Sequence, residues 1–281
     1  MKIGFTDFWT GFDPKNNIFY HSLKSTGLKF KIVKPHKADV VFFSCFGNNN
    51  LSLTNAKKIF FLSEDFKLEN FIFDYSISHI DDNAKKNNFR FPLWKMYIDW
   101  FEVNTYTNPE YLVPLNFIDS ENEFTKIDKE KFCSIVYSSE YYFREKYINL
   151  ISEYKKIDVY GKNKYNNYLK EGEYFKLKHL SKYKFSLAME NEISSGYLCE
   201  KLLHAKIVGN IPLFYGDDSA KIDFNPKSFI HITDFNEESL VKKIIEIDED
   251  HLLYKEILEQ PLFVKKPVID DFIENLYKIT N

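Results

Sequence analysis

Glu200 and Lys201 are adjacent residues in the first turn of a helix that the sequence predicts from Tyr197, with a stop at Gly209. Because neighbouring residues point in different directions on a helix, they cannot form the usual i,i+4 ion pair. The amino end of a helix favours the Glu200 carboxylate. It opposes the Lys201 ammonium unless an anion lies nearby, as a diphosphate would. The alternative is a solvated pair on an exposed turn, and spacing alone leaves both interpretations open.

Two further acids, Glu64 and Asp65, follow the apolar run 58–62, which predicts a strand. The carboxyl ends of strands in an open parallel sheet form its ligand-binding edge, so a carboxylate there could take the proton of an attacking hydroxyl. A partly desolvated cleft would raise its pKa, which helps proton abstraction near neutral pH. The alternative is that Ser63, Glu64 and Asp65 cap a helix.

The segment around Glu200 is predicted to form one β-loop-α-β unit. The run from Tyr183 predicts a strand that meets Glu190 and Asn191, and the small residues 194–196 then predict a turn. After the helix, residues 211–215 predict the next strand. The loop therefore lies at the carboxyl end of a strand, where open parallel sheets bind ligands.

The rest of the chain follows the same pattern. Short apolar runs alternate with helical patterns, which predicts an α/β fold built from parallel βα units. The polar stretch 120–131 predicts a domain boundary. Residues 268–278 predict an amphipathic helix that docks on the protein's own core. Other strands are expected at 2–5, 40–43, 75–78, 132–136 and 157–160, and a helix at 139–155.

Length and composition exclude several classes of protein. A chain of 281 residues with 44% hydrophobic residues can fill two cores, while a net charge of −3 provides no field for a nucleic-acid backbone. No run approaches the roughly 20 apolar residues of a membrane span. Three widely separated cysteines without metal-site spacing favour a reducing, cytoplasmic compartment: Cys45, Cys133 and Cys199. Asp248-Glu249-Asp250 matches the Asp-x-Asp pattern of metal-dependent transferases, but it lies in a polar helical stretch, so no metal site is predicted.

Residues 189–201 resemble the signature of the family 10 α-1,3/4-fucosyltransferases. That signature is Phe-Glu-Asn, a variable loop, Tyr-x-Thr-Glu-Lys and a strand x-Pro-x-x-x-Gly, and the last part corresponds to Pro212 and Gly216. Residues 223–235 resemble the family's continuation, and a weaker resemblance extends from about 59 to 160. Three residues depart from the pattern, because Met189, Cys199 and Ser63 stand where Phe, Thr and Gly are usual.

The resemblance implies roles for individual residues. Lys201 and Arg144 would neutralise the diphosphate of a nucleotide sugar, and Glu200 would contact its ribose or sugar. Glu64 would be the general base, with Asp65 in reserve. Arg144 is included because its surroundings, including residues 158–161, resemble the helix and strand that precede the signature. Without that context it would be assigned as a solvated helix residue. The remaining donor-pocket residues would be Glu190, Asn191 and Tyr197.

These implications lead to a specific expectation of fold and function. The fold would be GT-B, with two Rossmann-like domains facing a central cleft. Residues 1–125 would bind the acceptor, 126–265 would bind the GDP-sugar, and 266–281 would form a C-terminal amphipathic helix. The reaction would be inverting transfer of L-fucose from GDP-β-L-fucose to a glycan hydroxyl, α-1,3 to N-acetylglucosamine in a Gal-GlcNAc acceptor of a surface polysaccharide or lipopolysaccharide.

Several expectations concern partners and alternatives. No metal or cofactor would be required, since cationic side chains would stabilise the departing diphosphate. The acceptor could be an oligosaccharide or a lipid-linked glycan, and the cytoplasmic protein could lie at the inner membrane. One alternative is a GT-B transferase for a different nucleotide sugar. The other is a non-catalytic protein that binds a sugar nucleotide or a carbohydrate.

Overall fold

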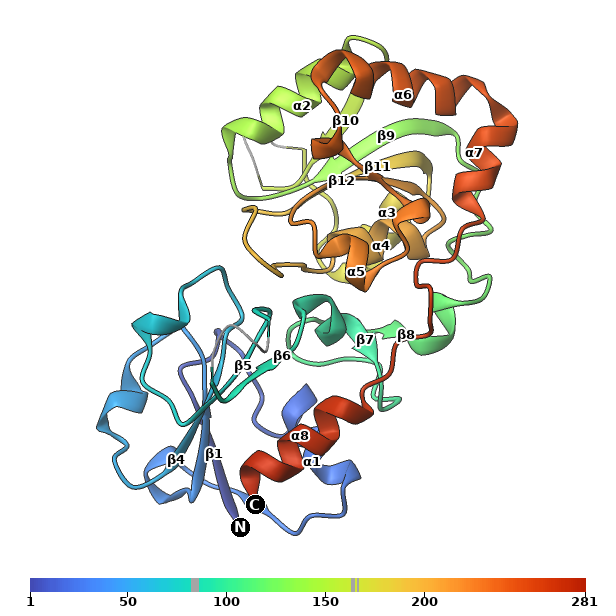
Figure 1. Cartoon of the computed structure of the whole chain (residues 1–281). Helices are drawn as coiled ribbons and strands as arrows, with labels where there is room; N and C mark the ends of the chain where they lie inside the picture. Colours follow the sequence, from blue (N-terminus) through green and yellow to red (C-terminus); the bar gives the residue numbers. More distant parts are fainter. Residues whose placement is uncertain (82–85, 163–164, 166) are drawn as a thin grey trace. The chain divides into compact units, whose positions relative to one another are not determined.

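The chain folds into two compact units in a computed structural model that describes residues 1–81, 86–162, 165 and 167–281 (Figure 1). The first unit contains Met1–Pro114, Ser195–Tyr197 and Pro267–Asn281, and the second contains Leu115–Ser194 and Leu198–Lys266. Both units are α/β, as predicted. No helix among the described residues combines the length and apolar character needed to cross a bilayer.

The first unit is built on a six-stranded parallel sheet with strand order β2-β1-β3-β4-β5-β6. Four of these strands were predicted to within one residue. Three were expected from short apolar runs, β1 (Lys2–Thr6), β3 (Val40–Phe43) and β4 (Lys57–Phe61), and the fourth, β5 (Tyr75–Ser78), was expected as an extended segment. The edge strands β2 (Lys31–Ile32) and β6 (Asn88–Arg90) were not predicted. A separate two-stranded pair joins β7 (Ile98–Asp99) to β8 (Val113–Pro114).

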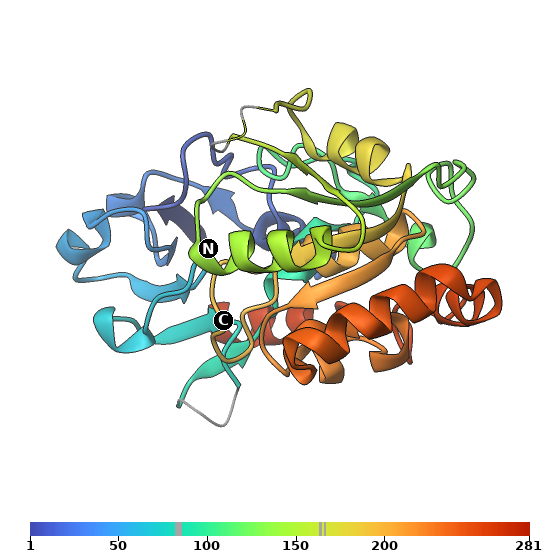
Figure 2. The ribbon, with the colours of Figure 1, turned by 90° about the horizontal axis from the view of Figure 1, so that it is seen from above.

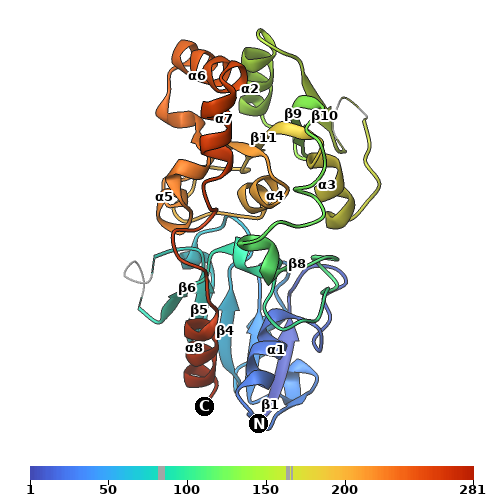
Figure 3. The same ribbon diagram turned by 90° about the vertical axis from the view of Figure 1, so that its right-hand side faces the viewer.

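Two α-helices pack together in this unit, α1 (Ile18–Ser25) and α8 (Asp270–Thr280) (Figure 3). The side chain of Phe272 on α8 is fully buried, and its ring lies 4.3 Å from that of Phe91 and 6.1 Å from that of Phe19. These three aromatic residues therefore form part of the core. Short 3-10 helices complete the unit: η1 (Pro35–Lys37), η2 (Asn49–Ser52), η3 (Leu68–Asn70) and η5 (Leu93–Tyr97).

The second unit has a five-stranded parallel sheet with strand order β10-β9-β11-β12-β13. The chain passes from β9 to one neighbour, β10, and then crosses to the other side of β9 to form β11. The order of strands therefore reverses between β9 and β11, and open α/β sheets bind ligands at such a point. The strands are β9 (Lys131–Val136), β10 (Ile157–Tyr160), β11 (Tyr183–Met189), β12 (Ile211–Tyr215) and β13 (Ile230–His231).

Helices α2 (Tyr142–Ser152) and α6 (Glu237–Glu249) lie side by side in this unit, where Lys146 Nζ is 2.8 Å from Glu237 Oε1 (Figure 2). The core beneath them includes Ile148, Leu187 and Ile244. The other helices are α3 (Glu173–Leu180), α4 (Lys201–Ile207), α5 (Ala220–Asp223) and α7 (His251–Leu258), with η6 (Leu115–Ile118), η7 (Pro226–Ser228) and η8 (Ile232–Asp234).

The limits of the units differ from the predicted 1–125, 126–265 and 266–281. Residues 115–125 belong to the second unit, because Asn122 Nδ2 donates to Ile207 O at 2.9 Å and Phe124 is buried beside the Tyr174 ring. Asn122 and Phe124 thus attach the start of the polar stretch 120–131 to the second unit. The predicted helix at 266–281 is present as α8, but it is part of the first unit and does not form a separate region of the chain.

Candidate active site

Glu190 is the centre of a charged cluster in the second unit, directly after β11. Glu190 is completely buried, and its backbone N–H donates to Tyr215 O at 2.8 Å. Carboxylate atom Oε1 accepts the backbone N–H of Cys199 at 2.8 Å, and Oε2 lies 2.7 Å from Lys201 Nζ. A buried carboxylate requires such partners because desolvation strongly disfavours an isolated charge.

Lys201 is held between two carboxylates at the start of α4. Burial opposes its positive charge, but the charges of Glu190 and Glu200 outweigh this effect and raise the pKa of Lys201. Nζ also lies 3.7 Å from Glu200 Oε2, so the two adjacent residues make a longer contact, although it is not an i,i+4 pair. A cation at the amino end of a helix is disfavoured unless an anion lies nearby, and the Glu190 carboxylate is such an anion. The predicted contact with a diphosphate stays a prediction.

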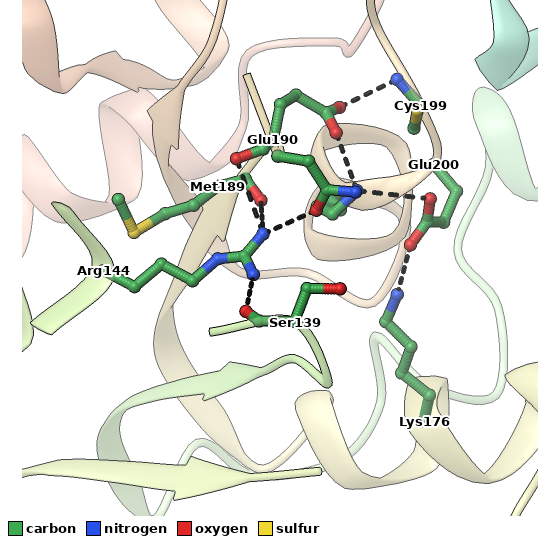
Figure 4. A network of polar contacts seen from close by, with 9 residues as sticks. Ser139, Arg144, Lys176, Met189, Glu190, Cys199 and Glu200 are labelled. Carbon is green, nitrogen blue, oxygen red and sulfur yellow. Dashed lines mark hydrogen bonds and ion pairs between the residues drawn. The ribbon is translucent and has the colours of Figure 1, made fainter. Parts of the chain in front are cut away.

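Glu200 is tied to a residue that sequence reasoning missed, Lys176 on α3. Their Nζ and Oε1 atoms lie 2.7 Å apart, and both side chains are mostly buried (Figure 4). Burial alone would raise the pKa of the Glu200 carboxyl, but Lys176 and Lys201 hold it well below its usual value. The alternative of a solvated Glu-Lys pair is therefore wrong.

Helix α4 begins at Lys201, four residues later than predicted. Gly196 has a φ of 74°, and the N–H of Cys199 donates to the Glu190 side chain. These two features keep the chain in a loop up to Glu200. The residue at the cap is Glu200, but its side chain makes no capping hydrogen bond and turns to Lys176 instead.

Arg144 is 1% exposed, so the alternative of a solvated helix residue is wrong. Its guanidinium donates to Ser139 O, to Asn191 Oδ1 at 2.8 Å and to Met189 O at 3.3 Å (Figure 4). Burial lowers the pKa of this arginine. Arg144 therefore joins the loop after β9 to the end of β11, across the reversal point of the sheet.

A cavity of about 20 Å³ lies beneath these residues and is bordered by Tyr137, Lys176 and Lys201. Ser134 Oγ and Arg144 Nε, from two residues that line it, are buried and have no hydrogen-bond partner among the described residues. Such a space can hold one water molecule but no nucleotide.

Tyr197, another predicted donor residue, belongs to the first unit together with Ser195 and Gly196. Its ring meets the ring of His79 edge to face at 5.2 Å, and His79 Nδ1 lies 3.1 Å from Ser195 O. His79 directly follows β5 and is almost fully buried. Burial lowers its pKa against the opposing influence of the Ser195 carbonyl and Asp65. Sequence reasoning missed His79 because its partners are distant in the chain.

Glu64 and Asp65 follow β4 and are half-buried. They cap no helix: the next helical element, η3, has Lys67 at its cap. The alternative of a helix cap is therefore wrong. Ser63 Oγ lies 2.9 Å from Ser44 Oγ, which fixes the start of this loop to the end of β3.

The acids of possible metal sites have other partners. Asp248 pairs with Lys155 at 2.6 Å and with Lys184, while Asp250 caps α7. Carboxylates of two more acids, Asp218 and Asp234, gather near His231, but Lys221 Nζ lies 2.8 and 2.7 Å from them. In that group a lysine ammonium already takes the place that a cation would fill.

Among the predicted site residues, the structure brings together Arg144, Glu190, Asn191, Glu200 and Lys201 in the second unit. Glu64, Asp65 and Tyr197 lie in the first unit. The arrangement in the second unit offers cationic and hydrogen-bonding groups at the carboxyl edge of a parallel sheet, as required for an anionic ligand. The first unit offers two half-buried carboxylates at the same edge of its own sheet.

Two family models match the chain. One, described as glycosyltransferase family 10 (fucosyltransferase) C-term, matches residues 127–259, and the other, described as α-(1,3)-fucosyltransferase FucT N-terminal domain, matches residues 3–97. A Helicobacter pylori α-(1,3)-fucosyltransferase is 26% identical over 260 residues, which cover 84% of this chain and 54% of the relative. The α-(1,3)-fucosyltransferase B of Drosophila melanogaster is 31% identical over 138 residues, covering 44% of this chain and 31% of the relative.

A solved α1,3-fucosyltransferase structure with GDP-fucose resembles the chain with a TM-score of 0.76 at 24% identity, covering 99% of this chain and 89% of that chain. This likeness confirms the predicted GT-B fold class. The chain spans about half or less of the length of the two curated relatives named above.

Proposed function

The chain belongs to glycosyltransferase family 10, and on that premise we propose that it is a fucosyltransferase. The reaction transfers L-fucose from GDP-β-L-fucose to a hydroxyl of a glycan with inversion at the anomeric carbon. The acceptor position is the 3-hydroxyl of N-acetylglucosamine in a Gal-GlcNAc unit. The observation that carries the proposal is the cationic cluster of Arg144 and Lys201 at the reversal point of a sheet that the family model covers.

The second unit holds the donor in this proposal. Lys201 has three N–H donors. One meets Glu190 and a second faces Glu200 at 3.7 Å, so a third can bind a diphosphate oxygen as charge develops on the leaving GDP. Glu190 and Glu200 keep Lys201 protonated. Arg144 and Asn191 contact each other at 2.8 Å and set the conformation of the loop that borders the donor. Glu200 contacts the nucleotide or the sugar. Tyr197, which belongs to the first unit, stays a predicted donor residue.

The first unit supplies the base and the acceptor site. Glu64 takes the proton of the acceptor hydroxyl while its oxygen forms a bond to the anomeric carbon and the bond to the diphosphate oxygen breaks. Asp65 is the reserve candidate. Both carboxylates follow a parallel strand and are half-buried, which supports this role.

Incubation with GDP-fucose and a neutral Gal-GlcNAc acceptor tests the proposal. We expect one deoxyhexose to be added to the acceptor by mass spectrometry, with one GDP released. Glu64→Gln should reduce kcat by more than 100-fold and leave GDP affinity unchanged, whereas Asp65→Asn should reduce kcat less than tenfold. The opposite ranking would move the role of base to Asp65.

A panel of other nucleotide sugars separates the alternatives. Turnover with another donor only would indicate a GT-B transferase of different specificity. GDP-fucose binding without transfer to any acceptor, with Glu64→Gln identical to the wild type, would indicate a non-catalytic binding protein.

A further inference from the structure

Five lysines line a groove of about 770 Å³ on the first unit. Lys2 begins β1 and Lys31 begins β2, so this groove lies at the amino edge of the sheet, whereas Glu64 and Asp65 follow the carboxyl end of β4. Lys2 and Lys31 are register partners in the parallel pair, which directs both side chains to the same face. The remaining three lysines come from α1 and the loops beside it: Lys15, Lys24 and Lys29.

The charges of these lysines are not balanced by carboxylates. All five residues are exposed, and within the described part of the chain none of them forms an ion pair. Elsewhere surface lysines do pair, as Lys131 does with Asp158 and Lys146 with Glu237. The groove contains a single acid, Asp39, and its Oδ2 atom accepts the backbone N–H of Lys2 at 2.7 Å.

Such a concentration of like charge creates a local positive potential on a protein whose net charge is −3. Each lysine repels the others. A bound anion is attracted by the lysines and also reduces the repulsion between them. The groove is therefore suited to a ligand with several separated negative charges.

The floor of the groove is apolar and partly aromatic. Tyr20 and Phe30 are half-buried, and their rings meet edge to face at 5.6 Å beside Leu28 and Ile32. A flat lipid surface would not follow a concave groove. Pyranose rings have apolar C–H faces that can pack on such side chains while their charged substituents reach the lysines.

We propose that this groove binds an acidic oligosaccharide, a chain of sugars that carries carboxylate, sulfate or phosphate groups, at a site separate from the carboxylates Glu64 and Asp65. This second proposal rests on the proposed function in one respect. The natural ligand of the groove would be part of the same glycan that contains the acceptor sugar. The groove then holds a distant, charged part of that glycan.

Calorimetric titration of the intact chain with a heparin-derived hexasaccharide tests the groove directly. The test variant is Lys24→Gln/Lys29→Gln. The matched control is Lys34→Gln/Lys37→Gln, which makes the same change of net charge at exposed lysines of the same unit that do not line the groove. We expect saturable, salt-sensitive binding that weakens at least tenfold in the test variant and less than twofold in the control.

Equal weakening in both variants, or no binding to the wild type, would overturn the proposal. Equal affinity for a neutral dextran hexasaccharide would do so as well, because the lysines would then be irrelevant. Tighter binding to vesicles of phosphatidylglycerol and phosphatidylcholine, with the same loss in the test variant, would instead assign the groove to a membrane. Equal or tighter binding to a DNA duplex would instead assign it to nucleic acid.

Transfer to a neutral Gal-GlcNAc acceptor is measured in parallel and keeps the two proposals distinguishable. The groove variant should retain wild-type kcat and KM with this small acceptor. Absence of any transfer would contradict the proposed function, while hexasaccharide binding would still report on the groove.

Discussion

Lys201 Nζ lies 2.7 Å from Glu190 Oε2, while Oε1 of the same carboxylate accepts the backbone N–H of Cys199 at 2.8 Å. One buried side chain thus fixes both the cation at the start of α4 and the loop that leads into it. Removal of its charge should affect the loop and the cation together.

Glu190→Gln retains an oxygen that can accept from Cys199 but leaves Lys201 without its closest carboxylate. Breaking a buried ion pair costs about 3 kcal/mol, so we expect a loss of roughly that size in the free energy of unfolding, measured with urea. GDP affinity should fall at least tenfold. The control is Glu237→Gln, which removes an exposed pair with Lys146 and should leave the free energy of unfolding nearly unchanged, because solvent screens such a pair. Wild-type stability in Glu190→Gln would show that the carboxylate charge is unimportant.

Gly196→Ala tests the three-residue segment that packs with His79. A Cβ atom at this position would lie 2.0 Å from His79 O, and the residue has a φ of 74°. We expect kcat/KM to fall more than tenfold, because Tyr197 and Ser195 must move. Gly27→Ala is a close control, since its φ is 76° but no atom lies within 4 Å of the added Cβ. If both variants lose activity equally, backbone strain and not the contact with His79 is responsible.

His204 predicts how stability depends on pH. Burial, together with the charges of Lys176 and Lys201, lowers its pKa to about 3 from 6.5. Between these values only the unfolded chain takes up the proton, so the contribution of His204 is complete above pH 6.5 and is lost as pH falls towards 3. The slope from this group approaches about 1.4 kcal/mol per pH unit.

His204→Gln should therefore remove that part of the pH dependence when unfolding is measured from pH 7 to pH 4. The exposed His251 provides the control, and His251→Gln should leave the slope unchanged. If the slope is unaltered in His204→Gln, burial of the neutral His204 imidazole is not the cause of the pH dependence of stability.

Cys199→Thr restores the residue that is usual in the family. The hydrogen bond from residue 199 to Glu190 uses the backbone N–H, which a threonine also provides. We expect kcat/KM for GDP-fucose to change less than threefold. A larger change, with donor preference altered in a panel of nucleotide sugars, would show that the side chain contacts the donor.

The accuracy of sequence-based prediction depended on the range of the interactions. Strands such as β3 were predicted because continuous apolar runs are a local signal, whereas the two-residue strand β2 begins with Lys31 and has no such pattern. The late start of α4 was missed because Glu190 takes the N–H of a residue nine positions later. Lys176 was missed for the same reason, since it pairs with Glu200 across 24 residues.

The position of α8 has a consequence for synthesis on the ribosome. The first unit needs α8, whose Phe272 fills the space beside Phe19 and Phe91, but the ribosome translates α8 only after the whole second unit. Domains usually acquire their structure in the order in which they emerge. Here the unit that emerges first would wait, with part of its aromatic core open, until α8 has also left the exit tunnel.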